Sequence, residues 1–389
     1  MTFQFILLYL WFTLSNLVGR ELFGQDAHNI KYIYFGMLLF VIFLNWKKYF
    51  CRLNNIKVIY VIVVLALVAT VRGYAEGNQG ILFNNIMIFG LFFYVIGYFY
   101  IDTDEKLEHF IKFNIACFIL LLLAKEIMFH KYGVSIIFGS NDLRDYGLIR
   151  KSSDTINSLG LIALIYSAAS KNKFKIIICA FIIYVLYRYG IRSSFVALFV
   201  VVIYQLITYL PLNMKRKINR LIPVISILLL VTVLIKWADI QYTMEDEIRI
   251  LSYKGVDQSG TFIWRLSMWY DTFNTIFDNQ LYLIGKVGKE VEFILTRHAY
   301  VNPHNSYIYA LVNYGLLTMV LIVIIPLRTL FYKNNYCNQS KLNKITASIL
   351  IMYMILSLST PIFELSYQGC TFWFFVGAYQ NLKERNEKR

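Results

Sequence analysis

Charged residues are scarce in this chain. Only 16% of its 389 residues are charged, whereas 58% are hydrophobic and the mean hydropathy is +0.55. A soluble domain of this length carries more charge and has no repeated apolar runs long enough to span a bilayer. The composition therefore predicts an all-α polytopic membrane protein.

Cysteine is also sparse, with five residues in the whole chain. None of them has the spacing of metal ligands, so we expect neither a zinc site nor a disulfide framework. Internal repeats, Gly/Ser linkers and low-complexity tracts are missing as well, which argues against the two fused halves of many transporters. We expect a single membrane domain over residues 1–389.

Apolar runs with about the length of a membrane-spanning helix recur twelve times. The first has no basic segment before it and no small-residue cleavage site, so we expect a span and not a cleaved signal peptide. Only a tight turn separates the seventh run from the eighth. The predicted spans cover about 3–19, 32–46, 57–71, 81–101, 110–129, 154–170, 174–190, 193–210, 220–238, 304–327, 344–360 and 366–381.

Basic residues in the short loops set the predicted orientation. With the N-terminus inside, every predicted inside loop is basic, as in Lys47-Lys48 and Lys215-Arg216-Lys217. Both termini are therefore expected to be cytoplasmic. This distribution also explains the formal net charge of +15. Since no basic face or nucleic-acid motif is present, we expect no nucleic-acid partner.

Two longer segments lie outside the membrane in this topology. The larger covers residues 239–303, between the ninth and tenth spans, and the smaller covers residues 130–153. Within the larger loop, residues 261–279 have apolar side chains near helical spacing. This pattern predicts an amphipathic helix that lies at the membrane surface.

His304 follows Asn302 and Pro303 where the larger loop meets the tenth span. Asn is a good N-cap and Pro is favoured at the first helical position, so we expect His304 in the first turn of that helix. The positive end of the helix dipole attracts phosphate there and favours a neutral imidazole that can accept a proton. Gly315 and Thr318 are predicted on the helix face beneath His304. The alternative is an interfacial histidine that only caps the loop.

Two arginines are predicted at the same surface. Arg265 lies in the amphipathic helix, and Arg192 follows the turn between the seventh and eighth spans. A guanidinium can form a forked pair with a diphosphate, and its charge does not titrate. For Arg265 the alternatives are an ion pair with Asp271 or Glu247, or snorkelling to lipid headgroups. For Arg192 the alternative is hydrogen bonding to free carbonyls of the turn.

Other polar groups give weaker signals. Arg144 and Arg150, in the smaller loop, form either a self-paired solvated cluster with nearby aspartates or a contact for saccharide or phosphate. The acidic run 245–247 has no histidine at ligand spacing. Gly285 and Gly288 follow no predicted strand and open no helix, so they do not form a nucleotide-binding loop.

Together these residues resemble the bacterial O-antigen ligase and O-antigen polymerase superfamily. Its ligase branch has a histidine followed by Asn, Ser or Gln, then nine residues, a glycine, two residues, and Gly, Thr or Tyr. This chain has His304, Asn305, Gly315 and Thr318 at that spacing. The family also has an arginine that opens a mid-chain span, and Arg192 matches it, although the residues around Arg192 depart from the usual pattern.

A further likeness lies in the larger loop, where the family has an Arg-x-x-x-Trp helix followed by a glycine-rich turn. Arg265 and Trp269 have that spacing, and residues 283–288 are a loose counterpart of the turn. The resemblance is strongest over about 188–318. The predicted layout of spans and loops agrees with this resemblance.

The resemblance implies a membrane glycosyltransferase of C-type architecture that uses an undecaprenyl-diphosphate-linked glycan as donor and needs no nucleotide sugar, no metal and no other cofactor. It assigns Arg192 and Arg265 to the diphosphate and His304 to the acceptor hydroxyl. It implies the bacterial inner membrane, a periplasmic active site, and membrane lipid and a chain-length regulator as partners. The further substrate contacts that we expect are Asn305, Arg144, Arg150, Trp269 and Arg188.

Two branches of the superfamily fit this pattern. A polymerase joins lipid-linked repeat units, whereas a ligase transfers the polymer to lipid A–core. We favour the polymerase because the residues around Arg192 depart from the ligase pattern and Asn302 stands where some ligases have a further histidine. A polysaccharide flippase is the third interpretation, although transporters usually show the repeat symmetry that this chain lacks.

Overall fold

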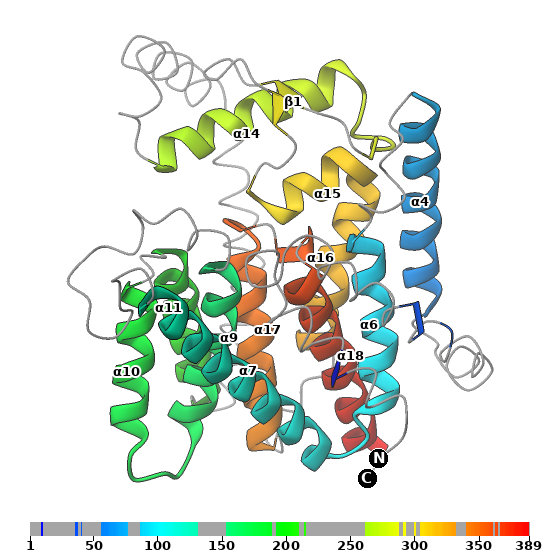
Figure 1. The fold of residues 1–389 in the computed structure, drawn as a ribbon. Helices are drawn as coiled ribbons and strands as arrows, with labels where there is room; N and C mark the ends of the chain where they lie inside the picture. Colours follow the sequence, from blue (N-terminus) through cyan, green and yellow to red (C-terminus); the bar gives the residue numbers. More distant parts are fainter. Residues whose placement is uncertain are drawn as a thin grey trace.

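A computed structural model shows a bundle of helices with one very short pair of strands (Figure 1). It describes residues 9–10, 36–37, 40, 56–76, 86–130, 153–188, 192–209, 214, 261–287, 291–292, 299–300, 304–331, 340–360, 362–364 and 366–388.

The elements follow the predicted apolar runs closely. The helices are α4 (Ile56–Ala75), α6 (Ile86–Tyr100), α7 (Asp104–His130), α9 (Ser153–Ala169), α10 (Lys175–Arg188), α11 (Arg192–Tyr209), α14 (Thr261–Asp278), α15 (Ser306–Tyr314), α16 (Leu316–Phe331), α17 (Lys341–Leu356), the 3-10 helix η4 (Ile362–Glu364) and α18 (Ser366–Lys388). Strands β1 (Val291–Glu292) and β2 (Ala299–Tyr300) pair antiparallel, with Val291 opposite Tyr300.

Helices α6 and α18 pack unusually closely because glycines face the opposite backbone. A Cβ atom added at Gly97 would lie 2.1 Å from the Phe374 carbonyl oxygen, and one added at Gly377 would lie 2.0 Å from that of Tyr94. Small residues at a helix interface let the two backbones approach closely. In a membrane, helix association depends on such van der Waals packing, because lipid tails are as apolar as the helix surfaces. The backbones of these two helices are therefore in direct contact.

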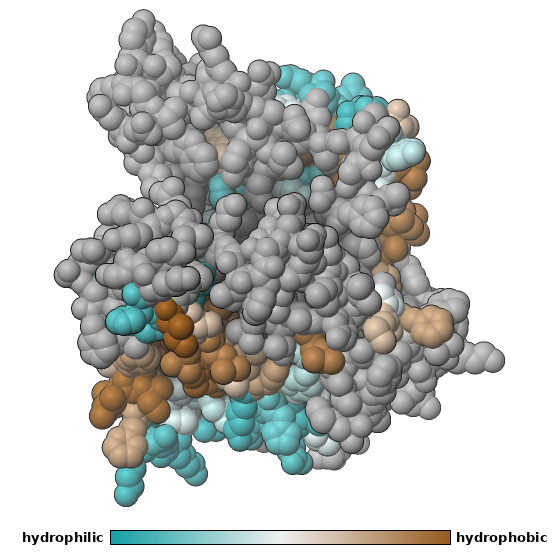
Figure 2. Space-filling model, in the orientation of Figure 1, coloured by the Kyte–Doolittle hydropathy of each residue, from teal (hydrophilic) through white to brown (hydrophobic). Residues whose placement is uncertain are grey.

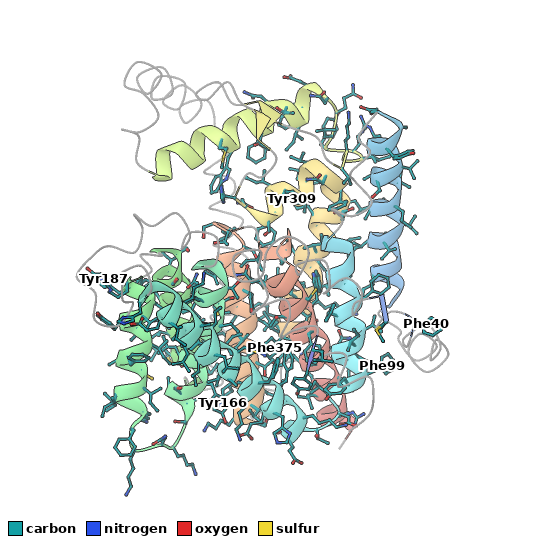
Figure 3. All side chains as sticks on the ribbon, viewed as in Figure 1. Phe40, Phe99, Tyr166, Tyr187, Tyr309 and Phe375 are labelled. Carbon is teal, nitrogen blue, oxygen red and sulfur yellow. The ribbon has the colours of Figure 1, made fainter. Side chains whose placement is uncertain are left out.

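Aromatic rings fill the space around this pair. The ring of Phe110 on α7 lies 4.1 Å from that of Phe374 and 5.3 Å from that of Phe375, between ring centroids. Phe375 lies in the interior of the bundle, whereas Tyr187 lies at its edge on α10 (Figure 3). Such offset and edge-to-face contacts add stabilisation beyond the area that they bury.

The ends of the helices form two groups, as the predicted alternation requires. At the lower end of Figure 1, Tyr98 at the end of α6 donates to Glu384 of α18, and Arg385 donates to the carbonyl of Asp102 just before α7. Lys383 donates to the carbonyl of Thr329 near the end of α16. Helices α14 and α15 lie at the opposite end. The described loops therefore fall on the two ends in the predicted order.

Large apolar side chains are exposed along the sides of the bundle. Figure 2 shows hydrophobic surface along the helices, with hydrophilic residues gathered toward the ends. A water-soluble protein of this size does not expose so many large apolar side chains on neighbouring helices, so this surface fits hydrocarbon better than water. Those on α4, α7, α10 and α11 include Val64, Leu67, Val71, Ile119, Leu123, Ile127, Ile176, Ile177, Val196, Phe199 and Leu206.

The prediction of helical spans is confirmed in part. The pair 174–190 and 193–210 forms two separate helices, α10 and α11. In the described part of the chain, the helix Asp104–Ile127 is long and apolar enough to cross a membrane, and five shorter apolar helices accompany it. The predicted spans 3–19, 32–46 and 220–238 lie wholly or almost wholly outside the described residues. Twelve spans therefore stay a prediction.

The two predicted outer loops are described to different extents. The larger, 239–303, contains α14, the turn 279–287 and the strand pair among its described residues. The amphipathic helix expected at 261–279 is confirmed within one residue at its end. Apart from its first and last residues, the smaller loop 130–153 lies outside the described part. The boundaries of both loops stay predictions.

The α6–α18 packing generates a stability prediction. Gly97→Ala and Gly377→Ala should each lower the free energy of unfolding by about 1–3 kcal/mol or more, because each new Cβ atom would meet backbone that cannot move aside. Thermal unfolding of the purified protein in detergent measures the effect.

Gly160→Ala is the matched control. Its Cβ would lie 3.1 Å from the side-chain ends of Leu186 and Phe118, which can shift. We expect a much smaller loss of thermal stability there. Equal losses for all three variants would contradict the close backbone packing of α6 and α18.

Candidate functional site

His304 has an unusual backbone conformation directly before α15. Its φ angle is 50°, and its side chain is half-buried. The left-handed region is unfavourable for residues with a Cβ atom, by about 1–2 kcal/mol. Non-glycine residues in this region occur at active sites and ligand clamps when the surrounding structure holds them there. The strain makes His304 a candidate site residue independently of any motif.

The predicted start of the helix after His304 is wrong. The N-cap is Asn305, whose side-chain oxygen accepts hydrogen bonds from the backbone N–H groups of Tyr307 and Ile308 at 3.0 and 3.1 Å. His304 therefore precedes the helix and does not lie in its first turn, because φ of 50° cannot continue a right-handed helix. Asn302 and Pro303, the expected cap and first residue, lie outside the described residues.

Ser306 fixes this segment to the end of α17. Its N–H donates to the Ser357 carbonyl at 2.9 Å, and its hydroxyl donates to the Thr360 carbonyl at 3.1 Å. The same hydroxyl accepts from the N–H of Phe363 at 3.2 Å. Ser306 is completely buried. Sequence reasoning missed it, because a serine that follows an N-cap has no signal of its own.

The predicted tenth span, 304–327, is not one helix. It divides at Gly315, whose φ of 85° separates α15 from α16. A Cβ atom at Gly315 would also lie 2.7 Å from the Leu283 carbonyl oxygen. Glycine is therefore required here both for its conformation and for the close approach. The expectation that Gly315 and Thr318 lie on one helix face beneath His304 is wrong, because the helix is interrupted.

Arg265 lies in the second turn of α14, which crosses the upper end of the bundle (Figure 1). Met268, Thr272 and Ile276 form the buried face of this helix, at helical spacing. Ile276 and Leu281 pack against Leu311 and Val312 of α15. These contacts join the helix that carries position 265 to the helix that follows His304. Trp269 is half-buried on the same helix.

The start of α11, at Arg192, is linked to the His304 segment through buried polar side chains. Ser194 of α11 donates to Asn157 of α9. Next to it, Ser158 accepts from the amide nitrogen of Gln368 on α18, at 3.4 Å. The residues before α18 form η4, where Phe363 binds Ser306. The starts of α9, α11 and α18 and the segment beside His304 are thus at one end of the molecule.

A second measure gives the same placement. Gln205 of α11 donates to Ser348 of α17 at 3.3 Å. Arg192 lies thirteen residues before Gln205, or about 20 Å along the helix axis at 1.5 Å per residue. From Ser348, the antiparallel α17 continues for eight residues, or about 12 Å, and the turn after its end carries Thr360, which accepts from Ser306. Position 192 therefore lies toward the same end of the bundle as the anchor of His304.

The other predicted site residues have different outcomes. Arg188 is the last residue of α10 and is half-buried, four residues before the start of α11. Arg144 and Arg150 lie outside the described residues. Buried polar residues such as Asn157 and Gln368 were missed. Their position in otherwise apolar helices is the signal that could have found them, because polar groups at membrane depth are rare without a partner or a function.

The described part of the chain holds no group of three or more His, Cys, Asp or Glu side chains that could bind a metal ion. The three cysteines described, Cys117, Cys179 and Cys370, form no disulfide within the described residues. Metal independence stays a prediction, and the chemistry that these residues can support is proton transfer and charge stabilisation by cationic side chains.

The Ser306 anchor generates a second prediction. Ser306→Ala should lower the free energy of unfolding by about 1–3 kcal/mol, since it leaves the Thr360 carbonyl and the Phe363 N–H without this buried partner. Ser359→Ala is the control, because Ser359 makes a hydrogen bond of 3.4 Å to the carbonyl three residues earlier. Thermal unfolding of both variants compares them, and an equally small effect would contradict the anchor.

Comparison with known proteins identifies the central part of the chain. A protein-family model described as O-antigen ligase matches residues 177–323. This range contains Arg188, Arg192, Arg265, Trp269 and His304. Searches of curated proteins and of solved structures found no match. Residues 177–323 thus match the O-antigen ligase family, and this match confirms, over that part of the chain, the resemblance to the O-antigen polymerase and ligase superfamily.

Proposed function

We propose that this protein is a polymerase of O-antigen, or of a related surface polysaccharide, in a bacterial inner membrane. It joins undecaprenyl-diphosphate-linked repeat units on the periplasmic side without a metal ion. The observation that supports this most directly is the buried polar cluster that links the start of α11 to the segment beside His304. It brings positions 192 and 304 to one end of the bundle.

In the proposed reaction, a hydroxyl of the acceptor glycan attacks the anomeric carbon of the donor. His304 accepts the hydroxyl proton as the new glycosidic C–O bond forms. The bond between the anomeric carbon and the phosphate oxygen breaks, and undecaprenyl diphosphate leaves with the electron pair. A positioned general base typically contributes about 10²–10⁴-fold to such a step.

Arg192 and Arg265 are proposed to bind the diphosphate. Two guanidiniums bring fixed positive charge to the leaving group and so do the work of a divalent cation in other glycosyltransferases. The packing of α14 on α15 supports this role for Arg265, because it joins position 265 to the element that follows His304. The start of α11, which carries position 192, lies at the same end of the bundle.

The proposed location follows from the chemistry of the substrate. The polyprenyl tail must stay in the hydrocarbon while the glycan needs water, so the diphosphate lies at the boundary. The exposed apolar sides of the bundle, with α14 and the His304 segment at one end, fit that requirement. With the basic loops inside, both termini are cytoplasmic and this end is periplasmic.

A ligase that transfers lipid-linked polysaccharide to lipid A–core is the second candidate. It is favoured by one observation, which is that the matching family model is described as O-antigen ligase. Both reactions use the same donor and the same proposed division of roles between the arginines and His304. They differ only in the acceptor, so a product analysis separates them.

Deletion of the gene tests the function. Surface lipopolysaccharide should carry core with a single repeat unit instead of a ladder on a gel. His304→Ala, Arg192→Ala and Arg265→Ala should each abolish the ladder while the protein still inserts. Lys112→Ala should restore it, because Lys112 pairs with Glu108 on an exposed surface at the other end of the bundle.

Each alternative gives a different gel. Bare core with accumulating lipid-linked polymer indicates the ligase, and single units held on the inner leaflet indicate a flippase. His304→Asn adds a sharper comparison, because asparagine tolerates the left-handed conformation but has no imidazole. A normal ladder from this variant would exclude His304 as the base.

The orientation gives a separate prediction. In a cysteine-free background, Phe277→Cys should react with a membrane-impermeant maleimide added to the periplasmic side. Phe277 lies on α14, at the proposed outer end. Phe174→Cys, in the turn before α10, should react only after the membrane is permeabilised.

The two positions are closely matched, since both are phenylalanines, 64% and 65% exposed. Differences in labelling therefore report the side of the membrane and not the accessibility of the side chain. The reverse pattern would place α14 in the cytoplasm and would remove the proposed function.

A further inference from the structure

Helix α4 binds the turn that joins α14 to the strand pair, although α4 lies far outside the family-matched range. A guanidinium nitrogen of Arg72 donates to the Ile284 carbonyl at 2.7 Å. The N–H of Val287 donates to the carbonyl of Ala69 at 3.4 Å. One helix near the start of the chain thus holds both sides of Gly285.

An ion-pair cluster reinforces these backbone contacts. Glu76, one residue after α4, accepts hydrogen bonds from Lys286 and, at 3.4 Å, from the Nε of Arg72. The hydrogen bond from Lys286, with a smaller contribution from Arg72, holds the pKa of the Glu76 carboxyl below its usual value. Exposed pairs contribute little stability alone. Here the ion pairs of Glu76 with Lys286 and Arg72 matter because they hold the turn beside α4, where the Val287 N–H binds the Ala69 carbonyl.

The same turn completes the interrupted helix after His304. In a continuous helix the carbonyl of Val312 would accept from the N–H of Leu316, but the break at Gly315 separates them. The N–H of Lys286 donates to the Val312 carbonyl at 3.0 Å, and the N–H of Leu316 donates to the Tyr282 carbonyl at 3.0 Å. The turn therefore binds one carbonyl and one N–H group that the break leaves without their helical partners.

Gly285 makes this exchange of hydrogen-bond partners possible. A Cβ atom at this position would lie 2.1 Å from the backbone nitrogen of Tyr314. The turn can approach the break closely enough for the two exchanged hydrogen bonds only if residue 285 has no side chain. The fit is therefore steric as well as electrostatic, and it leaves little freedom in the position of the turn.

We propose that Arg72, Glu76 and Lys286 are positioning residues that clasp the turn 281–287 and thereby set α14 against α15. The inference rests on the proposed function, because α14 carries Arg265 and α15 follows His304. The clasp itself is a property of the fold. Under this proposal, α4 helps to position the site, although it ends more than a hundred residues before the matched range.

Hydrogen exchange measured by mass spectrometry on the full-length protein in nanodiscs tests the clasp. Arg72→Ala and Lys286→Met should accelerate exchange of the amides of Lys286 and Leu316 by about tenfold, because charged hydrogen bonds of this kind restrain the local opening of the turn. Lys286→Arg keeps the charge and should restore slow exchange. The matched control is Lys112→Ala, which breaks the exposed pair with Glu108 and should leave these amides unchanged.

Transfer activity with a lipid-linked repeat unit tests the positioning role on the same variants. Arg72→Ala should lower kcat by about tenfold with KM changed less than about twofold, since a small displacement of α14 against α15 misplaces reacting groups without removing a substrate contact. Glu76→Gln should have the same effect in smaller degree. Thermal unfolding should stay near the wild-type temperature.

The outcomes separate the two claims. Unchanged exchange at Lys286 and Leu316 in Arg72→Ala would overturn the clasp. Accelerated exchange with unchanged kcat would overturn its positioning role. A wild-type protein with no transfer activity would remove the proposed function, and the exchange of these two amides would then still decide whether the clasp exists.

Discussion

Backbone hydrogen bonding in an apolar environment is the constraint on which this structure depends. The chain after His304 is interrupted at Gly315, and in a membrane bundle the carbonyl and N–H groups that such a break exposes need partners within the protein. Backbone groups of Tyr282 and Lys286 supply two of these partners, to the N–H of Leu316 and the carbonyl of Val312. The turn 281–287, which lies in a loop outside the predicted spans, is thus an integral part of the bundle.

The candidate site follows from this arrangement and from a second anchor. Ser306 binds the segment after α17 through both its backbone and its side chain, and this holds His304 in a conformation that it would otherwise avoid. The starts of α9, α11 and α18 meet nearby through Asn157, Ser158 and Gln368. Buried polar contacts therefore link positions 192 and 304, two of the three positions for which we propose a catalytic role.

Several local features could be predicted because they depend on short-range pattern. The apolar runs predict the helices from α4 to α18, and the amphipathic spacing predicts α14. The boundary at His304 could not be predicted in the same way. Asn302 and Asn305 are equally good caps by residue type, and the choice depends on which of them has free N–H groups within reach. The break at Gly315 was missed because glycine is also tolerated inside packed membrane helices.

The sequence alone determined the helical membrane character, the order of the described elements and the superfamily, since composition, hydrophobic run length and motif spacing are properties of the chain itself. Only the tertiary structure decided that the turn 281–287 completes the helix break, that Ser306 and Gln368 belong near the site, and that α4 is attached to it. These contacts join residues separated by 26 to 218 positions. No local pattern encodes them, because they arise from backbone groups and buried side chains whose partners are set by packing.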